Sequence, residues 1–121
     1  MSYTMEQTET QFFMDSSNLE PARKAILAAM SGFDWFKKRN ALTLESAVAQ
    51  CDWSLEFDDD DNVTGIEHLN EYEGQEKKLF VALAPYVKPG SYIQMRGEDG
   101  ELWRWYFDGT TCTEQEPAIT W

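Results

Sequence analysis

The densest group of chemically capable side chains is a run of carboxylates in the middle of the chain. Residues 52–76 contain ten Asp and Glu and no Lys or Arg, whereas residues 23–39 contain five basic residues and one acid. Repulsion among neighbouring carboxylates costs stability, and a cationic partner relieves it. The run therefore predicts a surface that binds a basic protein, with these contact residues: Asp58, Asp59, Asp60, Asp61, Glu67, Glu71 and Glu73. A solvated hairpin tip without a partner is the competing interpretation.

Part of this run also has the spacing of a calcium-binding EF-hand loop. The ligand positions and the turn glycine of such a loop fall on Asp60, Asn62, Thr64, Gly65 and Glu71. However, residues 53–58 alternate as a strand where an EF-hand needs a helix, and Glu67 stands where an apolar residue is usual. We therefore expect a hairpin turn here, with no metal site and no cofactor.

Catalytic groups are sparse. His68 is the single histidine, and neither Cys51 nor Cys112 belongs to a C-x-x-C pair. No Ser, Cys or Lys lies in a recognisable nucleophile motif, and no glycine-rich phosphate loop is present. We expect no catalytic residue and two small, buried cysteines. The alternative is a small ligand-binding protein or enzyme that uses His68 and nearby carboxylates.

The composition limits the class of protein. The chain has 121 residues, a formal net charge of -12, 42% hydrophobic residues and 14% aromatic residues. This is enough apolar material for one core, and the acidic balance argues against direct binding to nucleic acid or an anionic membrane. No apolar run is long enough to span a membrane, and two cysteines suit a reducing cytoplasm. We expect an unstructured tail over residues 1–10 and one cytoplasmic domain over residues 11–121.

The elements that must position the carboxylates follow from hydrophobic periodicity. Helical spacing predicts helices over residues 18–31, from the Thr43 cap to about residue 51, and from residue 75 to the stop at Pro89. Alternation predicts a strand over 53–58, with Trp53, Leu55 and Phe57 on the buried face, that returns over 63–71. A short strand is expected over residues 11–15.

The last third of the chain predicts a three-stranded meander. Side-chain parity between residues 91–96 and 102–107 favours a three-residue loop at 98–100 with Gly100 left-handed. This loop pairs Met95 with Trp103 and Ile93 with Trp105 on the buried face. A two-residue turn at Asp108–Gly109 then places Cys112 opposite Trp105.

Two further expectations concern the outer face of the meander and the C-terminal residues. The face opposite the core is expected to be solvated, with cross-strand Tyr and Arg pairs, and carries Tyr92, Gln94, Arg96, Arg104 and Tyr106. Whether that face is free or a dimer contact is left open. The C-terminal Ile119 and Trp121 are expected to pack back as a tail or an edge strand.

These elements give an α+β fold, with N-terminal helices, an antiparallel hairpin, a helix and the meander, and with the helices on one face of the sheet. The stretch APYVKPGSYIQMRGEDGELWRWYFDG (residues 84–109), preceded by the hairpin segment WSLEFDDDDN, resembles small acidic bacterial proteins without an assigned activity. The resemblance covers roughly residues 53–107. It implies a compact α+β domain in a bacterial cytoplasm and transfers no functional residue.

The favoured function is a non-enzymatic interaction module that binds a basic protein, as immunity proteins and inhibitors do. A DNA-mimic inhibitor of a DNA-binding enzyme is an alternative from a different class. It requires carboxylates spread along an extended surface, whereas this chain crowds them on one hairpin.

Overall fold

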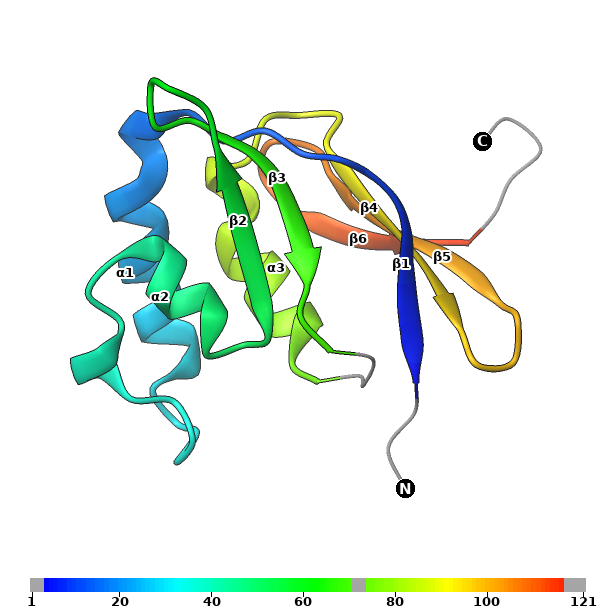
Figure 1. The fold of residues 1–121 in the computed structure, drawn as a ribbon, viewed down its shortest axis with the longest axis horizontal. Helices are drawn as coiled ribbons and strands as arrows, with labels where there is room; N and C mark the ends of the chain where they lie inside the picture. The colour runs from blue at the N-terminus through cyan, green and yellow to red at the C-terminus, as the bar shows by residue number, and fades with distance from the viewer. Residues whose placement is uncertain (1–3, 71–73, 117–121) are drawn as a thin grey trace.

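The computed structural model describes residues 4–70 and 74–116 and confirms the α+β class (Figure 1). Within those residues, a four-stranded antiparallel sheet has the order β1-β4-β5-β6, and β2 and β3 form a separate hairpin. The elements in chain order are β1 (Met5–Gln11), η1 (Ser16–Asn18), α1 (Leu19–Met30), η2 (Lys38–Asn40), α2 (Leu44–Ala49), β2 (Trp53–Phe57), β3 (Val63–His68), α3 (Glu76–Leu83), η3 (Ala84–Tyr86), β4 (Tyr92–Gly97), β5 (Leu102–Phe107) and β6 (Cys112–Gln115). The predicted packing of Ile119 and Trp121 lies outside the described residues.

The helices lie on one face of the four-stranded sheet, and in Figure 1 the β2–β3 hairpin runs in front of α3, with α1 and α2 to its left. Phe80 of α3 joins the two sheets in the core. Its ring meets Trp53 of the hairpin at a centroid distance of 5.1 Å, and Trp105 and Phe107 of the sheet at 5.4 Å and 5.8 Å. Edge-to-face contacts of this kind add to the burial of large apolar rings. The hairpin is therefore held against the body of the protein by aromatic packing.

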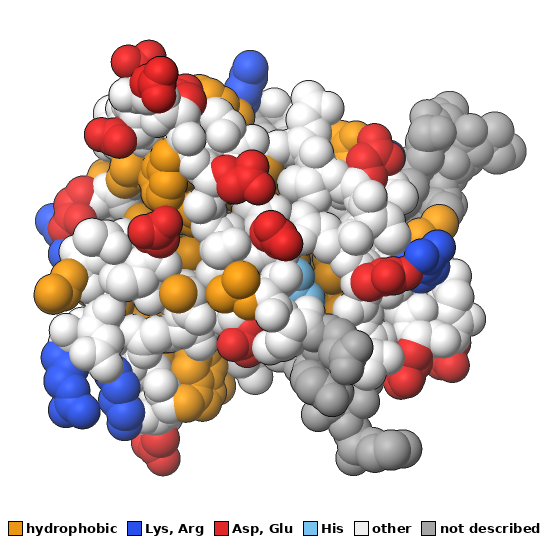
Figure 2. Space-filling view, in the orientation of Figure 1, with side chains coloured by type: hydrophobic (Ala, Val, Ile, Leu, Met, Phe, Trp, Pro, Cys, Tyr) orange, Lys and Arg blue, Asp and Glu red, His pale blue; other side chains and the backbone are white. Residues whose placement is uncertain are grey.

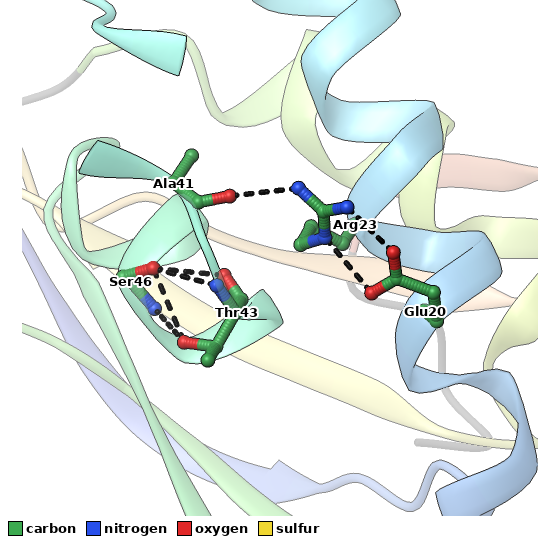
Figure 3. A network of polar contacts seen from close by, with 5 residues as sticks. All are labelled: Glu20, Arg23, Ala41, Thr43 and Ser46. Atoms are coloured by element: carbon green, nitrogen blue, oxygen red, sulfur yellow. Dashed lines mark hydrogen bonds and ion pairs between the residues drawn. The ribbon is translucent and has the colours of Figure 1, made fainter. Parts of the chain in front are cut away.

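The three predicted helices are present, although the third ends at Leu83, before Pro85, rather than at Pro89. Polar contacts fix how α1 and α2 meet (Figure 3). Thr43 caps α2 by accepting from the Ser46 N–H at 3.1 Å, and Ser46 Oγ accepts from the Thr43 N–H at 3.0 Å. This reciprocal arrangement is a capping box. From α1, Arg23 donates to the Ala41 carbonyl at 2.9 Å and pairs with Glu20 at 2.5 Å.

The β4–β5 hairpin has the predicted register. Met95 lies opposite Trp103, and Ile93 lies opposite Trp105. The loop of residues 98–100 is closed by the Gly97 N–H, which donates to the Glu101 carbonyl at 2.9 Å. Gly100 has φ 86, the left-handed conformation that such a loop needs at its last position. Side-chain parity was therefore sufficient to predict this three-residue loop.

The predicted turn at Asp108–Gly109 is wrong in length. Cys112 lies opposite Phe107, and Trp105 lies opposite Glu114, so the connection spans residues 108–111. The Asp108 carboxylate accepts from the N–H groups of Thr110 and Thr111 at 2.8 Å and 2.7 Å. These bonds stabilise a longer loop, because an Asp side chain can replace a backbone acceptor in a turn. The observed pairing of β5 and β6 differs from the predicted one by two residues. Because this number is even, Cys112 stays on the same face of the sheet and packs against the core as expected.

The predicted unstructured tail over residues 1–10 is also wrong for its described part. Residues 5–11 form β1, which pairs with β4 along its length and buries Met5. The short strand expected over residues 11–15 reduces to an isolated bridge between Met14 and Val63. The sequence MEQTETQ carries little apolar material, so it forms a strand only because an existing sheet edge supplies backbone partners.

The outer face of the sheet carries the cross-strand pairs that were expected. The Arg104 guanidinium lies 4.0 Å from the centroid of the Tyr92 ring, and Arg104 Nε donates to Gln94 Oε1 at 2.9 Å. The β1 strand adds carboxylates to this face: Glu6 pairs with Arg96, and Glu9 accepts from the Tyr92 hydroxyl at 2.7 Å. The acids of β1 are therefore matched by neighbours on the same face.

Candidate functional site

The predicted contact residues that the structure describes lie on the β2–β3 hairpin. Asp58 to Asp61 form the loop between the two strands, and Glu67 lies on β3 with an exposed side chain. Glu56 of β2 is exposed as well, and Ser54 of β2 lies opposite Glu67. We call residues Glu56, Asp58–Asp61 and Glu67 the acidic hairpin surface. The other two predicted contacts, Glu71 and Glu73, lie outside the described residues.

Asp58 has a structural task within this surface. Its carboxylate accepts from the backbone N–H groups of Asp60 at 2.9 Å and Asn62 at 3.0 Å, and from the Asn62 side chain at 3.1 Å. The bonds from Asn62 and Asp60 lower the pKa of Asp58, because they stabilise its ionised form. Asn62 in turn accepts from the Ser16 N–H at 2.9 Å. The loop is therefore ordered while its charge is retained.

The other carboxylates of the acidic hairpin surface face solvent without a cation. In the described part of the chain, no Lys or Arg nitrogen lies within 4.0 Å of them, since the ion pairs found there involve other acids. Figure 1 places the β2–β3 loop at the opposite end of the hairpin from η2, which contains Lys38 and Arg39. Figure 2 shows a group of acidic side chains at the upper left and a group of basic side chains at the lower left. The chain's own basic cluster does not neutralise this surface.

An apolar side chain borders these carboxylates. Phe57 was predicted to lie on the buried face of its strand, but it is 38% exposed. The register of β2 and β3 shifts between Glu56 and Phe57, because Thr64 is an extra residue on β3. Phe57 is the last residue of β2, next to the loop, and its side chain is only partly covered there. The acidic hairpin surface therefore has an aromatic ring at its edge.

The calcium-loop pattern does not fold as an EF-hand. Residues 53–57 form a strand, and the Asn62 side chain is bonded to the Ser16 backbone and to Asp58. Over residues 4–70 and 74–116, no three His, Cys, Asp or Glu side chains are grouped to hold a metal ion. The last ligand position of the pattern, Glu71, lies outside the described residues.

His68 lies on the inward side of the hairpin. Its ring stacks on Trp53 at a centroid distance of 4.5 Å, and Nε2 lies 3.8 Å from Glu76 Oε1. Both side chains are 3% exposed, and both Glu76 oxygens accept from the Gly74 N–H at 2.8 Å. Burial lowers the pKa of His68, because the charged imidazolium loses its hydration. The structure therefore brings a neutral histidine and a buried carboxylate together.

Sequence reasoning counted Glu76 with the surface acids. Only its position in the first turn of α3, one turn before Leu79 and Phe80, could have indicated that it is buried.

The cysteines are less reactive than ordinary thiols. Burial raises the pKa of Cys51 and of Cys112 to about 12, so both are protonated at neutral pH. Neither cysteine is an activated nucleophile.

A groove that the sequence did not indicate separates β1 from β3. The segment that follows β1 is joined to the first residue of β3, where Met14 and Val63 exchange backbone hydrogen bonds of 2.9 Å and 2.8 Å, and β1 and β3 diverge from there (Figure 1). The space between them has a volume of about 540 Å³ and is lined mainly by residues 5–10 and 64–68. We call it the edge groove.

The side chain of Gln7 bridges the edge groove. Its Nε2 donates to the Ile66 carbonyl at 2.7 Å and also bonds to Thr10 Oγ1, while its Oε1 accepts from the His68 N–H at 2.9 Å. Glu56 and Glu67 contribute carboxylates to the groove lining. The edge groove and the acidic hairpin surface are therefore continuous.

Comparison with known proteins adds no relative. No family model, curated protein or solved structure matches the chain. Among the described residues, no helix has the length and apolar character needed to cross a membrane. The site must therefore be interpreted from its own geometry and charge.

Proposed function

We propose that this protein is a non-enzymatic interaction module, of the immunity or inhibitor type, that binds a basic protein through the acidic hairpin surface. One observation carries the proposal: Asp59, Asp60, Asp61 and Glu67 are exposed, and no Lys or Arg of the described chain lies within 4.0 Å of them. Carboxylates crowded in this way repel one another, and a cationic partner would relieve that cost on binding.

The neighbouring aromatic ring gives the surface a second type of contact. Phe57 is 38% exposed directly beside the acidic loop. Interfaces draw much of their affinity from a few buried aromatic anchors, whereas charges at the rim mainly set the association rate and its salt dependence. We therefore expect Phe57 to contribute to the lifetime of the complex and the loop carboxylates to its rate of formation.

The arrangement supports this function over the two alternatives. A DNA mimic needs carboxylates in regular rows along an extended surface, whereas the densest group described here, Asp58–Asp61, is crowded into one hairpin loop. An enzyme or ligand-binding protein built on His68 would need an accessible imidazole, and its side chain is 3% exposed against Trp53. Both alternatives are therefore ranked lower.

The test is charge reversal with a matched control. One variant carries Asp59→Lys, Asp60→Lys, Asp61→Lys and Glu67→Lys, and leaves Asp58 in place to hold the loop. The control reverses exposed acids far from the hairpin, at Glu98, Asp99, Glu101 and Glu114, so that the net charge changes equally. Affinity capture from a bacterial lysate, followed by cross-linking, should recover the same basic protein with the wild type and the control.

The hairpin variant should lose that protein, and complexes of the wild type should weaken steeply as salt is added. Retention of the same partner by the hairpin variant would contradict the proposal. So would a cross-linked partner whose contacts lie only on other surfaces.

A further inference from the structure

The edge groove lies between two strand edges that neither sheet uses. β1 ends the four-stranded sheet, and β3 is one of only two strands in its hairpin, so each has one edge without a ladder partner. Strand edges present backbone donors and acceptors that readily pair with another extended chain. Beyond the Met14–Val63 bridge, the described residues show no backbone ladder between β1 and β3. The edge groove therefore has the chemical requirements for an added strand.

The side-chain amide of Gln7 makes the hydrogen bonds to β3 that one residue of an added strand would make. It donates to the Ile66 carbonyl and accepts from the His68 N–H, two residues further along β3. One residue of a neighbouring parallel strand makes the same two slanted bonds through its own N–H and C=O. Because the Met14–Val63 bridge is antiparallel, a segment parallel to β3 would run antiparallel to β1. The pattern therefore fixes the direction that an inserted segment would take.

The backbone of His68 is the group that an inserted segment would meet. Its side chain is 3% exposed and stacked on Trp53, so the imidazole is enclosed on the inward side of the hairpin. Its N–H, in contrast, donates across the edge groove to Gln7 Oε1 at 2.9 Å. This N–H becomes available to an inserted backbone once the Gln7 amide moves away.

The charge of the groove lining indicates which kind of segment it would bind. The groove lining includes Glu56 and Glu67, which have no Lys or Arg within 4.0 Å among the described residues. A second copy of this chain carries the same formal charge of -12 and would be repelled. A segment that contains lysine or arginine would instead be attracted to the hairpin wall of the groove, where Glu56 and Glu67 lie.

We infer that the edge groove binds an extended, lysine- or arginine-containing segment of a partner protein as an added strand, parallel to β3 and antiparallel to β1. The inference rests on the proposed function, since it assumes a basic partner, and it adds how part of that partner is recognised. The inserted backbone displaces the Gln7 amide and takes over its bonds to Ile66 and His68.

The experiment uses an N-acetylated peptide of about eight residues, alternating lysine and threonine, as the probe. The control peptide has every threonine N-methylated, which keeps its charge and side chains but removes alternate N–H donors. Binding to the full-length, isotope-labelled protein is followed through the backbone amide resonances. We expect shifts in β1 and β3, and an affinity about tenfold lower for the N-methylated peptide, because several backbone hydrogen bonds are lost.

Two protein variants sharpen the test. Gln7→Ala removes the amide that the segment must displace and should bind the first peptide about tenfold more tightly than the wild type. Gln11→Ala truncates an exposed glutamine of the same strand and should bind like the wild type. A purely structural role for Gln7 would give no gain in affinity. If Gln7→Ala does not fold, the comparison of the two peptides on the wild-type protein still decides the question.

Three results would overturn the inference: equal binding of the two peptides, shifts confined to residues 58–61, or no binding at all. The proposed function would survive each of them, since a basic partner can contact the acidic hairpin surface without adding a strand. If the peptide inserts in the groove but the hairpin variant captures the same partner as the wild type, only the proposed function is overturned.

Discussion

The imidazole of His68 is stacked on the indole of Trp53, with ring centroids 4.5 Å apart and an interplanar angle of 29°. The two residues are cross-strand partners in the β2–β3 hairpin, on the side that faces α3. This position explains why the histidine stays neutral: the apolar ring beside it cannot replace the water that a charged imidazolium needs. The stacking places a titratable group in the middle of the contact between the hairpin and the core.

Protein stability should therefore depend on the ionisation of His68. Burial lowers the pKa of His68 below its ordinary value of 6.5, against the opposing effect of the Asp52 charge. The unfolded chain then binds more protons than the folded one in mild acid, so stability rises with pH across this range. The contribution is complete above about pH 6.5 and is lost as the pH falls through this value toward the folded-state pKa.

Urea unfolding between about pH 8 and pH 5, a range above the ordinary pKa of Asp and Glu, measures this effect. His68→Phe keeps a ring against Trp53 and removes the titration, so the free energy of unfolding of this variant should vary less with pH than that of the wild type. The Glu76 carboxylate, 3.8 Å from Nε2, faces the same ring and is present in both proteins. Equal pH dependence in the two proteins would show that His68 is not the group responsible.

Gln7→Ala should weaken the attachment of the hairpin to β1. The Gln7 amide makes hydrogen bonds of 2.7 Å and 2.9 Å across the edge groove, to Ile66 and to the N–H of His68. Loss of both bonds should lower the free energy of unfolding by about 1–3 kcal/mol, as measured by urea denaturation. Gln11→Ala, on the same strand, should change it by less than about 0.5 kcal/mol. Faster hydrogen exchange confined to β1 and β3 would locate the effect, and equal stabilities of the two variants would contradict it.

Some of the fold followed from the sequence because local signals and burial agreed. The alternation of Ile93 and Met95 against Trp103 and Trp105 leaves one register that places all four on the face toward the core, and the structure has that register. Thr43 likewise precedes an amphipathic segment and caps α2 as expected. In these places, a wrong alternative would have exposed apolar rings or left helix N–H groups unbonded.

Other features depend on partners that are distant in the sequence. β1 is polar and becomes a strand only beside β4, some ninety residues later, where Arg96 and Tyr92 pair with its acids. The length of the 108–111 loop depends on which backbone donors Asp108 accepts, a choice that the residue types alone do not fix. The acidic loop was predicted from composition, whereas the edge groove arises only from how two sheets diverge.

Gly109→Ala should be destabilising, for a reason specific to this loop. Gly109 has φ 96, and a Cβ atom there would lie 2.7 Å from Pro89 Cγ. A left-handed backbone that carries a side chain costs about 1–3 kcal/mol, and the clash with a rigid proline ring adds to it. Gly32→Ala is the control, because a Cβ at that position meets no atom within 4 Å. Thermal unfolding should show a lower Tm for Gly109→Ala and an unchanged or higher Tm for Gly32→Ala; the same Tm for both would be inconsistent with the strained loop.

The charge on the β2–β3 loop should itself destabilise the free protein. Asp59 and Asp60 are exposed beside two further aspartates, and no Lys or Arg among the described residues lies within 4.0 Å of them. The double variant Asp59→Asn, Asp60→Asn removes part of this repulsion and should raise the Tm at low ionic strength. Asp99→Asn, in the exposed loop of the other hairpin, should have a smaller effect.

About 1 M sodium chloride should abolish the difference between the loop variant and the wild type, because exposed charges are then screened over a few ångströms. A gain in Tm that persists in high salt would mean that the side-chain amides act through hydrogen bonds or loop conformation. A loss of Tm at low salt would mean that the aspartates stabilise the loop, which would remove the electrostatic basis for binding a basic partner.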